Sequence, residues 1–415
     1  MNPPRRVRLC LKDLYHQDVV EMIERETKRY ELHAIEDVGD PDFDVAYEIL
    51  WDAFGAADEM EPKSVLIHWL KEDPFTPTDS GSFIRYFMIV ARDRDGQIRG
   101  VRDGTIMINP SYAPDLCVIY LAHIYMLPAA RGTVLSYWLR IAPVEIAMQY
   151  MADLHSRGLI ELPMPDRPGK YFGMQLDLVA EMEYFNPAER ISWQRILFYG
   201  RGGFDAIDPR HFPFQQPDFR PPERIAETGQ HPLPFMLLVR RMGRERVATI
   251  PIAEATAIVR LMRDDHATYC TPEAMELTYG TLMRRLEERA AQKSYVALLP
   301  LPTGPQNLGR LRRLFRHNVY GRFYAGTPAT EAWLNSGIKE LLAQNPRYLE
   351  DAIAEIHEEL IARKEDVYAS RERGFTWEGA AVSASEAASE AAEALTGSDF
   401  PDESTLTRPP EGWAF

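Results

Sequence analysis

The chain has 415 residues, of which 45% are hydrophobic and 11% aromatic, and it carries a formal net charge of −15 at pH 7. This length exceeds that of one ordinary domain, and the apolar content is enough to bury a core, which excludes a wholly disordered or fibrous protein. The acidic balance argues against non-specific binding to nucleic acid, because the polyanion repels an acidic protein.

Cellular location and metal binding are constrained by what the sequence lacks. No run approaches the roughly eighteen apolar residues that a membrane span needs, and residues 1–8 contain no apolar core of a secretory signal. Cys10, Cys117 and Cys270 lie far apart without metal-ligand spacing, and the ten His include no HExxH pattern. We therefore expect a cytoplasmic protein with no disulfide scaffold, no membrane contact and no metal site.

Apolar periodicity over residues 1–245 predicts a mixed α/β sheet. In chain order, the first expected elements are a strand at 6–10, helices around 19–23, 49–54 and 65–69, and a hairpin of strands 83–90 and 100–108 around the turn signal Arg94-Asp-Gly96. Residues 116–126 (LCVIYLAHIYM) are an uninterrupted apolar run, which predicts one long buried strand. After it we expect a helix at 134–157, a strand at 173–184, a helix at 187–198, and strands at 204–207 and 234–240.

The pattern changes to mainly helical beyond residue 246. Helices are predicted at 250–264, 272–292, 329–344 and 345–368, with one strand at 295–301. From residue 376 the chain is acidic and rich in Ala, Ser and Glu, which is typical of disorder. We therefore predict an α/β domain at 1–245, a mainly helical domain at 246–375 and a disordered acidic tail at 376–415.

The segment most informative about function is a predicted strand–turn–helix unit at residues 116–157, with Arg131 and Gly132 at the junction of the turn and the helix. The first backbone N–H groups of a helix are unpaired and carry the positive end of its dipole, so such an entry can bind an anion. A glycine there permits close approach of a phosphate, and an arginine adds a charged hydrogen bond. The alternative is a tight turn that uses the glycine for its conformation alone.

Four segments in a fixed order extend this argument. They are IYLAHIYMLPAARG (119–132), the helix entry RGTVLS (131–136), LVAEMEYFNP (178–187) and RILFYGRGGFDAID (195–208). Together they resemble the GNAT superfamily of acyl-CoA-dependent N-acetyltransferases, and the resemblance covers roughly residues 5–245. It implies a GNAT-like mixed, largely antiparallel sheet flanked by helices, and acetyl-CoA as the co-substrate.

The resemblance also implies a donor site. The pantetheine arm would pair with the strand that ends at Ile124, Tyr125 and Met126, and the pyrophosphate would lie on the helix entry made by Arg131, Gly132, Thr133, Val134, Leu135 and Ser136. This chain departs from the family pattern twice. Val134 stands where glycine is expected, and Ser136 stands where glycine or alanine is expected. The β-branched side chain of Val134 would crowd a pyrophosphate.

For catalysis, the family pattern assigns Tyr199 as the acid that protonates the leaving thiolate, against the alternative of a core aromatic residue. Ala122 stands where many members carry a glutamate base. Glu181 and Glu183 lie on the second strand of the site, and a period of two puts both on one face, where they would bind the amine or take its proton. Their alternative is a strand end that reaches solvent.

The function expected from this pattern is transfer of an acetyl group from acetyl-CoA to a small-molecule or peptide amine, by direct attack in a ternary complex. Two other classes stay open at this point. One is a GNAT-fold binding protein that has lost turnover, which Val134 and Ala122 favour. The other is a helical scaffold acting through residues 250–370, and a homo-oligomer is compatible with each of these readings.

Overall fold

The computed structural model describes residues 5–6, 28–55, 59–131, 133, 135–163, 170–171, 173–183, 195–196, 198–200, 202–207, 212, 214–220, 222–230, 232–244, 247 and 249–301. Several predicted elements lie outside these residues. They are most of the strand at 6–10, the helix around 19–23, most of the helix at 187–198, the helices at 329–344 and 345–368, and the tail at 376–415.

A single twisted sheet organises the described part of the chain, in the order β1-β2-β3-β4-β5-β8-β11-β9-β13-β12, with β6 beside β4, β7 beside β8 and β10 beside β11. The strands are β1 (Arg5–Arg6), β2 (Tyr30–Ile35), β3 (Phe83–Asp93), β4 (Ile98–Ile108), β5 (Leu116–Tyr120), β6 (Ile124–Met126), β7 (Lys170–Tyr171), β8 (Met174–Glu183), β9 (Asp205–Ile207), β10 (Gln215–Gln216), β11 (Leu233–Arg241), β12 (Thr249–Pro251) and β13 (Tyr295–Pro300). Among these strands only β5 and β8 pair in parallel, so the predicted mixed, largely antiparallel sheet is confirmed.

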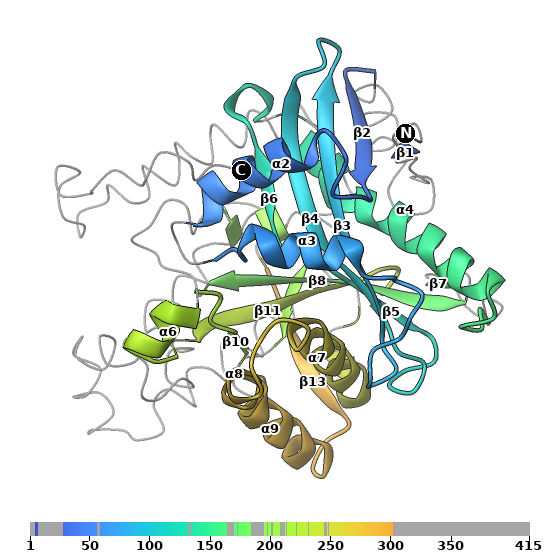
Figure 1. Ribbon diagram of the computed structural model, residues 1–415. Coiled ribbons are helices and arrows are strands. Elements are labelled where there is room, and N and C mark those ends of the chain that lie inside the picture. Colours follow the sequence, from blue (N-terminus) through green and yellow to red (C-terminus); the bar gives the residue numbers. More distant parts are fainter. Residues whose placement is uncertain are drawn as a thin grey trace, which may run out of the picture.

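Helices cover both faces of the sheet. They are α2 (Phe43–Phe54), α3 (Lys63–Lys71), the short η2 (Pro128–Ala130), α4 (Leu135–Ser156), α6 (Pro222–Thr228), α7 (Ile252–His266), α8 (Pro272–Met275), the π-helical turn η3 (Glu276–Gly280) and α9 (Thr281–Ala290). Figure 1 shows α2 and α3 lying across β3 and β4, with α7 and α9 farther along the sheet. The long helix α4, predicted at 134–157, packs on β3, β4 and β5.

The predicted hairpin is confirmed as β3 and β4, which pair from Phe83 opposite Ile108 to Arg92 opposite Ile98. The side chains of β3 pack alternately into two cores, because successive side chains of a strand point to opposite faces. Phe87 and Ile89 join the core under α4, whereas Tyr86 and Met88 join the core under α2 and α3. The strand is therefore apolar on both faces, as expected for a sheet covered on both sides.

The prediction of one strand at 116–126 is wrong. The run is divided into β5 and β6, and residues 121–123 between them are not part of either strand. Thr105 pairs with Tyr120 and Arg102 pairs with Ile124, so Asp103 and Gly104 face the three residues 121–123 in a β-bulge. Leu121 still donates to the carbonyl of Val179 on β8, but β6 pairs only with β4 among the described strands.

Glycine is required at the bulge by the close approach of the chain. A Cβ atom on Gly104 would lie 2.1 Å from the carbonyl oxygen of Tyr120 and 2.8 Å from the ring of Phe87. No other residue can let the two strands come this close. The bulge therefore turns the chain away from β8 and opens a gap between β6 and β8.

Other differences lie outside the hairpin. Strand β2, strand β10 and helix α6 have no counterpart in the predicted elements, and the helix expected at 272–292 is divided by the π-helical turn η3. The strands predicted at 173–184, 204–207, 234–240 and 295–301 are confirmed as β8, β9, β11 and β13.

Residues 249–301 belong to the same sheet as the preceding part of the chain, because β13 pairs with β9. Helix α7 contributes Ile258 and Met262 to a core that also contains Val179 of β8. Buried charges fix the contact: Arg241 donates to Glu254 of α7, and Arg244 joins Glu254 to Asp177 of β8. The division at residue 245 and a separate helical domain stay a prediction. Within the described ranges, no helix is long and apolar enough to cross a membrane.

Candidate functional site

The gap between β6 and β8 is a small cavity of about 60 Å³ that opens to solvent. Its wall combines carboxylates, aromatic rings and two cations, and consists of Phe54, Glu59, Glu61, Tyr120, Ala122, His123, Ile124, Glu181, Met182, Glu183, Arg195, Tyr199, Gln216, Phe219 and Phe235. We call it the split cavity.

All three residues predicted to act in catalysis line the split cavity. Glu181 and Glu183 stand two residues apart on β8 beyond its last pair with β5, where Tyr120 faces Val179. Tyr199 reaches the cavity from the helical segment at 198–200. Glu183 is ion-paired with Arg195, which is buried. The sheet therefore brings together residues that the sequence placed on separate elements.

Two further carboxylates in the cavity, Glu59 and Glu61, were missed by the sequence reasoning. They come from the connection between α2 and α3, which contains no recognisable motif. Burial raises the pKa of Glu59 to about 7, with opposing effects of Arg195 and Glu183. Burial also raises the pKa of Glu61, whose side chain is only 6% exposed and accepts a hydrogen bond from Tyr269 at 3.3 Å.

Glu181 is a buried acid of β8 whose protonation is strongly affected by its surroundings. Burial raises its pKa to about 8, and the charge of Glu61 adds to this, although Tyr120 and Gln216 lower it. Both carboxylate oxygens are shielded from solvent and have no hydrogen bond of ordinary geometry within the described residues. A carboxyl group whose pKa is close to neutral pH can take and return a proton, which is the requirement for a general base.

His123 is held as a cation and cannot act as a base. Its Nδ1 lies 3.0 Å from Asp103 Oδ1 and its Nε2 lies 2.8 Å from the carbonyl oxygen of Glu59. Both partners are acceptors, so both ring nitrogens carry protons. Burial lowers the pKa of His123, but the Asp103 carboxylate, the charge of Glu61 and the Glu59 carbonyl together outweigh burial and raise that pKa to about 10. Asp103 also accepts from the backbone N–H of His123 at 2.9 Å, which explains why the strand breaks there.

Tyr199 keeps its proton at neutral pH. Burial raises its pKa, while the nearby cations Arg102 and Arg195 oppose this effect. Arg102 is 2% exposed, and its Nε has no hydrogen-bond partner among the described residues. A neutral phenol beside a guanidinium is a suitable proton donor, because the cation stabilises the phenolate that remains after transfer.

The predicted donor side lies along β6 and the entry of α4. Ile124, Tyr125 and Met126 pair with Arg102, Val101 and Gly100 of β4, and no described strand pairs with their other edge. Arg131 donates through Nε to the carbonyl of Met126 at 3.1 Å and through Nη2 to the Tyr125 hydroxyl at 3.3 Å.

The helix entry itself is described in part. The Thr133 hydroxyl accepts from the N–H of Leu135 at 3.3 Å and donates to the carbonyl of Ala130 at 2.7 Å, so it caps α4. Ser136 is half-buried and its hydroxyl points back to the carbonyl of Thr133 at 3.4 Å. Gly132 and Val134 lie outside the described residues, so the crowding expected from Val134 stays a prediction.

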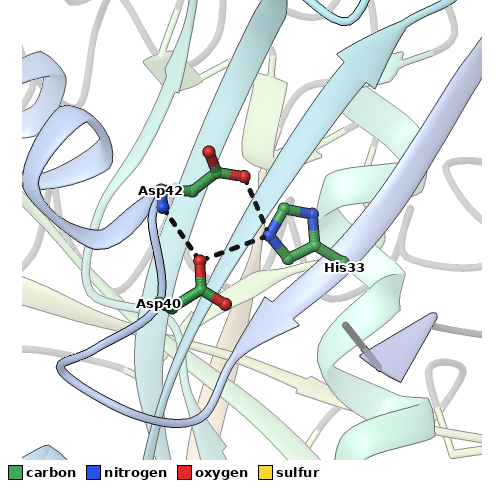
Figure 2. Close-up of side chains that lie close together, drawn as sticks. All are labelled: His33, Asp40 and Asp42. Atoms are coloured by element: carbon green, nitrogen blue, oxygen red, sulfur yellow. Dashed lines mark hydrogen bonds and ion pairs between the residues drawn. The ribbon is translucent and has the colours of Figure 1, made fainter. Parts of the chain in front are cut away.

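A second polar cluster has the composition of a metal site. Figure 2 shows His33 of β2 with Asp40 and Asp42 of the following loop, all pointing toward one another. The ligand atoms already have partners, however. His33 Nε2 lies 3.0 Å from Asp42 Oδ2, Asp40 Oδ1 accepts from the backbone N–H of Asp42, and Arg92 binds both oxygens of Asp42. The cluster therefore connects the loop to β2 and β3, and the Arg92 guanidinium already supplies the positive charge that a metal ion would bring.

No family model and no curated protein matches the sequence. The chain does match several GNAT-fold acetyltransferases of known structure over about half of its length. One is a GNAT superfamily phosphinothricin acetyltransferase from Sinorhizobium meliloti in complex with acetyl-CoA, at 18% identity and a TM-score of 0.28, covering 51% of this chain and 89% of that chain. Another is a spermidine N-acetyltransferase from Vibrio cholerae in complex with CoA and spermine, at 10% identity and a TM-score of 0.29, covering 52% of this chain and 98% of that chain. At such values the likeness concerns the fold alone.

Proposed function

We propose that the protein transfers an acetyl group from acetyl-CoA to an amine bound in the split cavity. The observation that carries this proposal is the meeting of Glu181 and Tyr199 in one cavity beside the unpaired edge of β6. A proton acceptor and a proton donor thus line the same space, in which an amine and a thioester would meet. This arrangement suits acyl transfer to nitrogen, which needs both groups.

The donor would bind along β6 and the entry of α4. The free edge of β6 offers backbone N–H and C=O groups to the amide groups of a pantetheine arm, as one strand does to another. Arg131 and the hydroxyl of Ser136 would contact the pyrophosphate at the helix N-terminus. In this reading the Arg131 bonds to Met126 and Tyr125 position the guanidinium at the end of the strand.

The reaction follows from the groups in the cavity. The amine nitrogen attacks the thioester carbonyl carbon, the C–N bond forms, the C–S bond breaks and the electron pair leaves with sulfur. Glu181 in its ionised form takes the proton that the nitrogen loses, and the Tyr199 hydroxyl gives a proton to the thiolate. The products are an N-acetylated amine and the free thiol of CoA. Because the pKa of Glu181 is about 8, the rate should rise between pH 6 and 8 as this carboxyl ionises.

The test is release of the CoA thiol from acetyl-CoA in the presence of a panel of primary amines, with the mass of the acetylated product as a second readout. Turnover that rises with pH and is lost in Glu181→Gln supports the proposal. Tight binding of acetyl-CoA with no acetylated product for any amine would refute it and favour a binding protein that has lost turnover.

A further inference from the structure

A buried arginine of α4 holds the chain segment that carries Tyr199. Arg140 lies in the second turn of α4 and is only 3% exposed. Its Nη1 donates a hydrogen bond to the carbonyl oxygen of Phe198 at 3.1 Å, and its Cζ lies 4.0 Å from the centroid of the Phe198 ring. The guanidinium therefore binds the residue before Tyr199 through both its backbone and its side chain.

The turn after Tyr199 has room for this guanidinium because it contains a glycine. A Cβ atom on Gly202 would lie 2.4 Å from Arg140 Nη1, which is closer than two non-bonded atoms can approach. The backbone of Gly202 does not adopt the left-handed conformation, so the contact with Arg140, and not a torsion angle, requires a glycine here. The N–H of Gly202 also donates to the Phe198 carbonyl at 3.1 Å, so one oxygen accepts from both the turn and α4.

The same segment fixes the Tyr199 ring at the wall of the split cavity. The ring makes edge-to-face contacts with Phe198 and Phe204, with a centroid separation of 5.4 Å in each case. The N–H of Phe204 donates to the carbonyl of Tyr199 at 3.1 Å. Because Arg140 binds Phe198, a displacement of the guanidinium would be passed on to the Tyr199 hydroxyl, and proton transfer is sensitive to the position of the donor.

The charge of the arginine acts in the same direction as its contacts. Burial raises the pKa of Tyr199, and the cations Arg102 and Arg195 lower it. Glu183, which forms an ion pair with Arg195, raises this pKa, and Arg140 lowers it. A guanidinium close to the ring favours the phenolate that remains once the hydroxyl has given its proton away. Packing alone does not explain Arg140, since an apolar side chain would fill the same space without burying a charge.

We propose that Arg140 is the positioning residue that holds Tyr199 for proton transfer to the leaving thiolate. This inference rests on the proposed function and adds a residue to it. Among the described residues Arg140 is not part of the cavity wall, so it reaches the reaction only through Phe198 and Tyr199. The proton passes from the Tyr199 oxygen to the sulfur, and the guanidinium keeps all its own protons. Helix α4 would then hold the donor at its entry and the acid at its second turn.

The first experiment measures the phenol without any turnover. A difluorinated tyrosine replaces Tyr199 in the full-length protein and is titrated by fluorine NMR, because the fluorines lower the phenol pKa into a range in which the protein stays folded. Arg140→Met should raise this pKa by roughly half a pH unit or more, since a cation is removed from an otherwise intact segment. If Arg140 only supports the fold, its loss would admit water and lower the pKa. A lowered or unchanged pKa would overturn the inference.

The second experiment is a double-mutant cycle on the acetylation rate. Arg140→Met should lower kcat roughly 10- to 100-fold with an unchanged KM for acetyl-CoA, and Arg140→Lys, which keeps the charge, should recover part of the loss. In a Tyr199→Phe background the same substitution should change kcat by less than about twofold, because no acid is left to position. An equal loss in both backgrounds would show that Arg140 acts elsewhere and would overturn the inference.

Gly202→Ala displaces the guanidinium and leaves its charge in the chain. It should lower kcat as Arg140→Met does, and it should have little further effect in Arg140→Ala, where the added Cβ no longer meets the guanidinium. A loss that is undiminished in Arg140→Ala would contradict the contact. The matched control is Arg157→Met, because Arg157 lies 3.6 Å from the ring centroid of Phe75 beyond the other end of α4. This variant should leave both kcat and the phenol pKa unchanged.

The two experiments separate this inference from the proposed function. If amines are acetylated but Arg140→Met alters neither kcat nor the phenol pKa, the positioning role is wrong and the proposed function stands. If no amine is acetylated, the proposed function fails, and the NMR titration still shows whether Arg140 holds the phenol.

Discussion

Replacing Glu181 by Gln should stabilise the protein at alkaline pH while it abolishes turnover. The folded protein holds the Glu181 proton with a pKa of about 8, against 4.5 for an ordinary glutamate. Because this pKa is raised by folding, the contribution of Glu181 to stability is fully present below about pH 4.5 and is lost as the pH rises through 8. Glutamine has nearly the same shape and cannot ionise, so the variant avoids this loss.

The size of the change in stability follows from the shift in the pKa of Glu181. Ionising a carboxyl whose pKa is raised by about three and a half units costs on the order of 3 kcal/mol between pH 5 and pH 8, at 1.36 kcal/mol for each unit. For a folded body of this size, such a change corresponds to roughly 5–8 °C in melting temperature. A gain in stability on replacing an active-site residue is expected, because functional sites are commonly maintained at a cost in stability.

Thermal unfolding followed by circular dichroism at pH 5 and pH 8 measures the difference. Glu183→Gln is the matched control on the same strand, because Glu183 forms an ion pair with buried Arg195. That variant should lower the melting temperature at both pH values, since it leaves a buried guanidinium without its carboxylate. If Glu181→Gln is less stable than the parent at pH 8, or shifts the melting temperature equally at both pH values, Glu181 is not a buried carboxyl that resists ionisation.

Three further predictions concern the residues around the split cavity. Tyr199→Phe should lower kcat by roughly 10²–10⁴-fold with an unchanged KM for acetyl-CoA, and unaltered turnover at pH 7 would remove Tyr199 from the acid role. Asp103→Asn should lower the free energy of unfolding in urea by about 3–5 kcal/mol, because it leaves His123 without its carboxylate. The ion pair stabilises the protein fully below pH 6.5, and this contribution is lost as the pH rises through about 10. A destabilisation that persists at pH 11 would therefore contradict the role of the ion pair. Gly104→Ala should lower the free energy of unfolding by about 2–4 kcal/mol in the same assay, because the added Cβ would collide with Tyr120. The control Gly96→Ala, whose Cβ meets nothing within 4 Å, should lower it by about 1 kcal/mol. Similar losses for both variants would refute the steric argument.

Local patterns predicted the elements whose signals are local. The hairpin of β3 and β4 has two apolar, strand-forming runs around an Asp-Gly turn, and α4 is a long, largely apolar run. The break between β5 and β6 could not be predicted this way. Residues 121–123 (Leu-Ala-His) contain no Gly or Pro that would signal a break, and the bulge depends on Asp103 and Gly104 of another strand.

The candidate site was predictable on the strands but not on the loops. Glu181 and Glu183 follow from the period of β8, and their common face needs no tertiary information. Glu59 and Glu61 lie far from β8 in the sequence, in a connection with no motif, and only the packing of α2 on β6 and β4 brings them to the cavity. The ionisation of these acids depends on burial, which a sequence does not give.

The most direct test of the central claim is isothermal titration of the full-length protein with acetyl-CoA, in the parent and in Arg131→Ala. The account predicts micromolar binding in the parent and roughly tenfold weaker binding in the variant, because a guanidinium that contacts the pyrophosphate contributes a charged hydrogen bond. No binding at millimolar acetyl-CoA, or equal binding by both proteins, would contradict the donor site along β6 and the entry of α4.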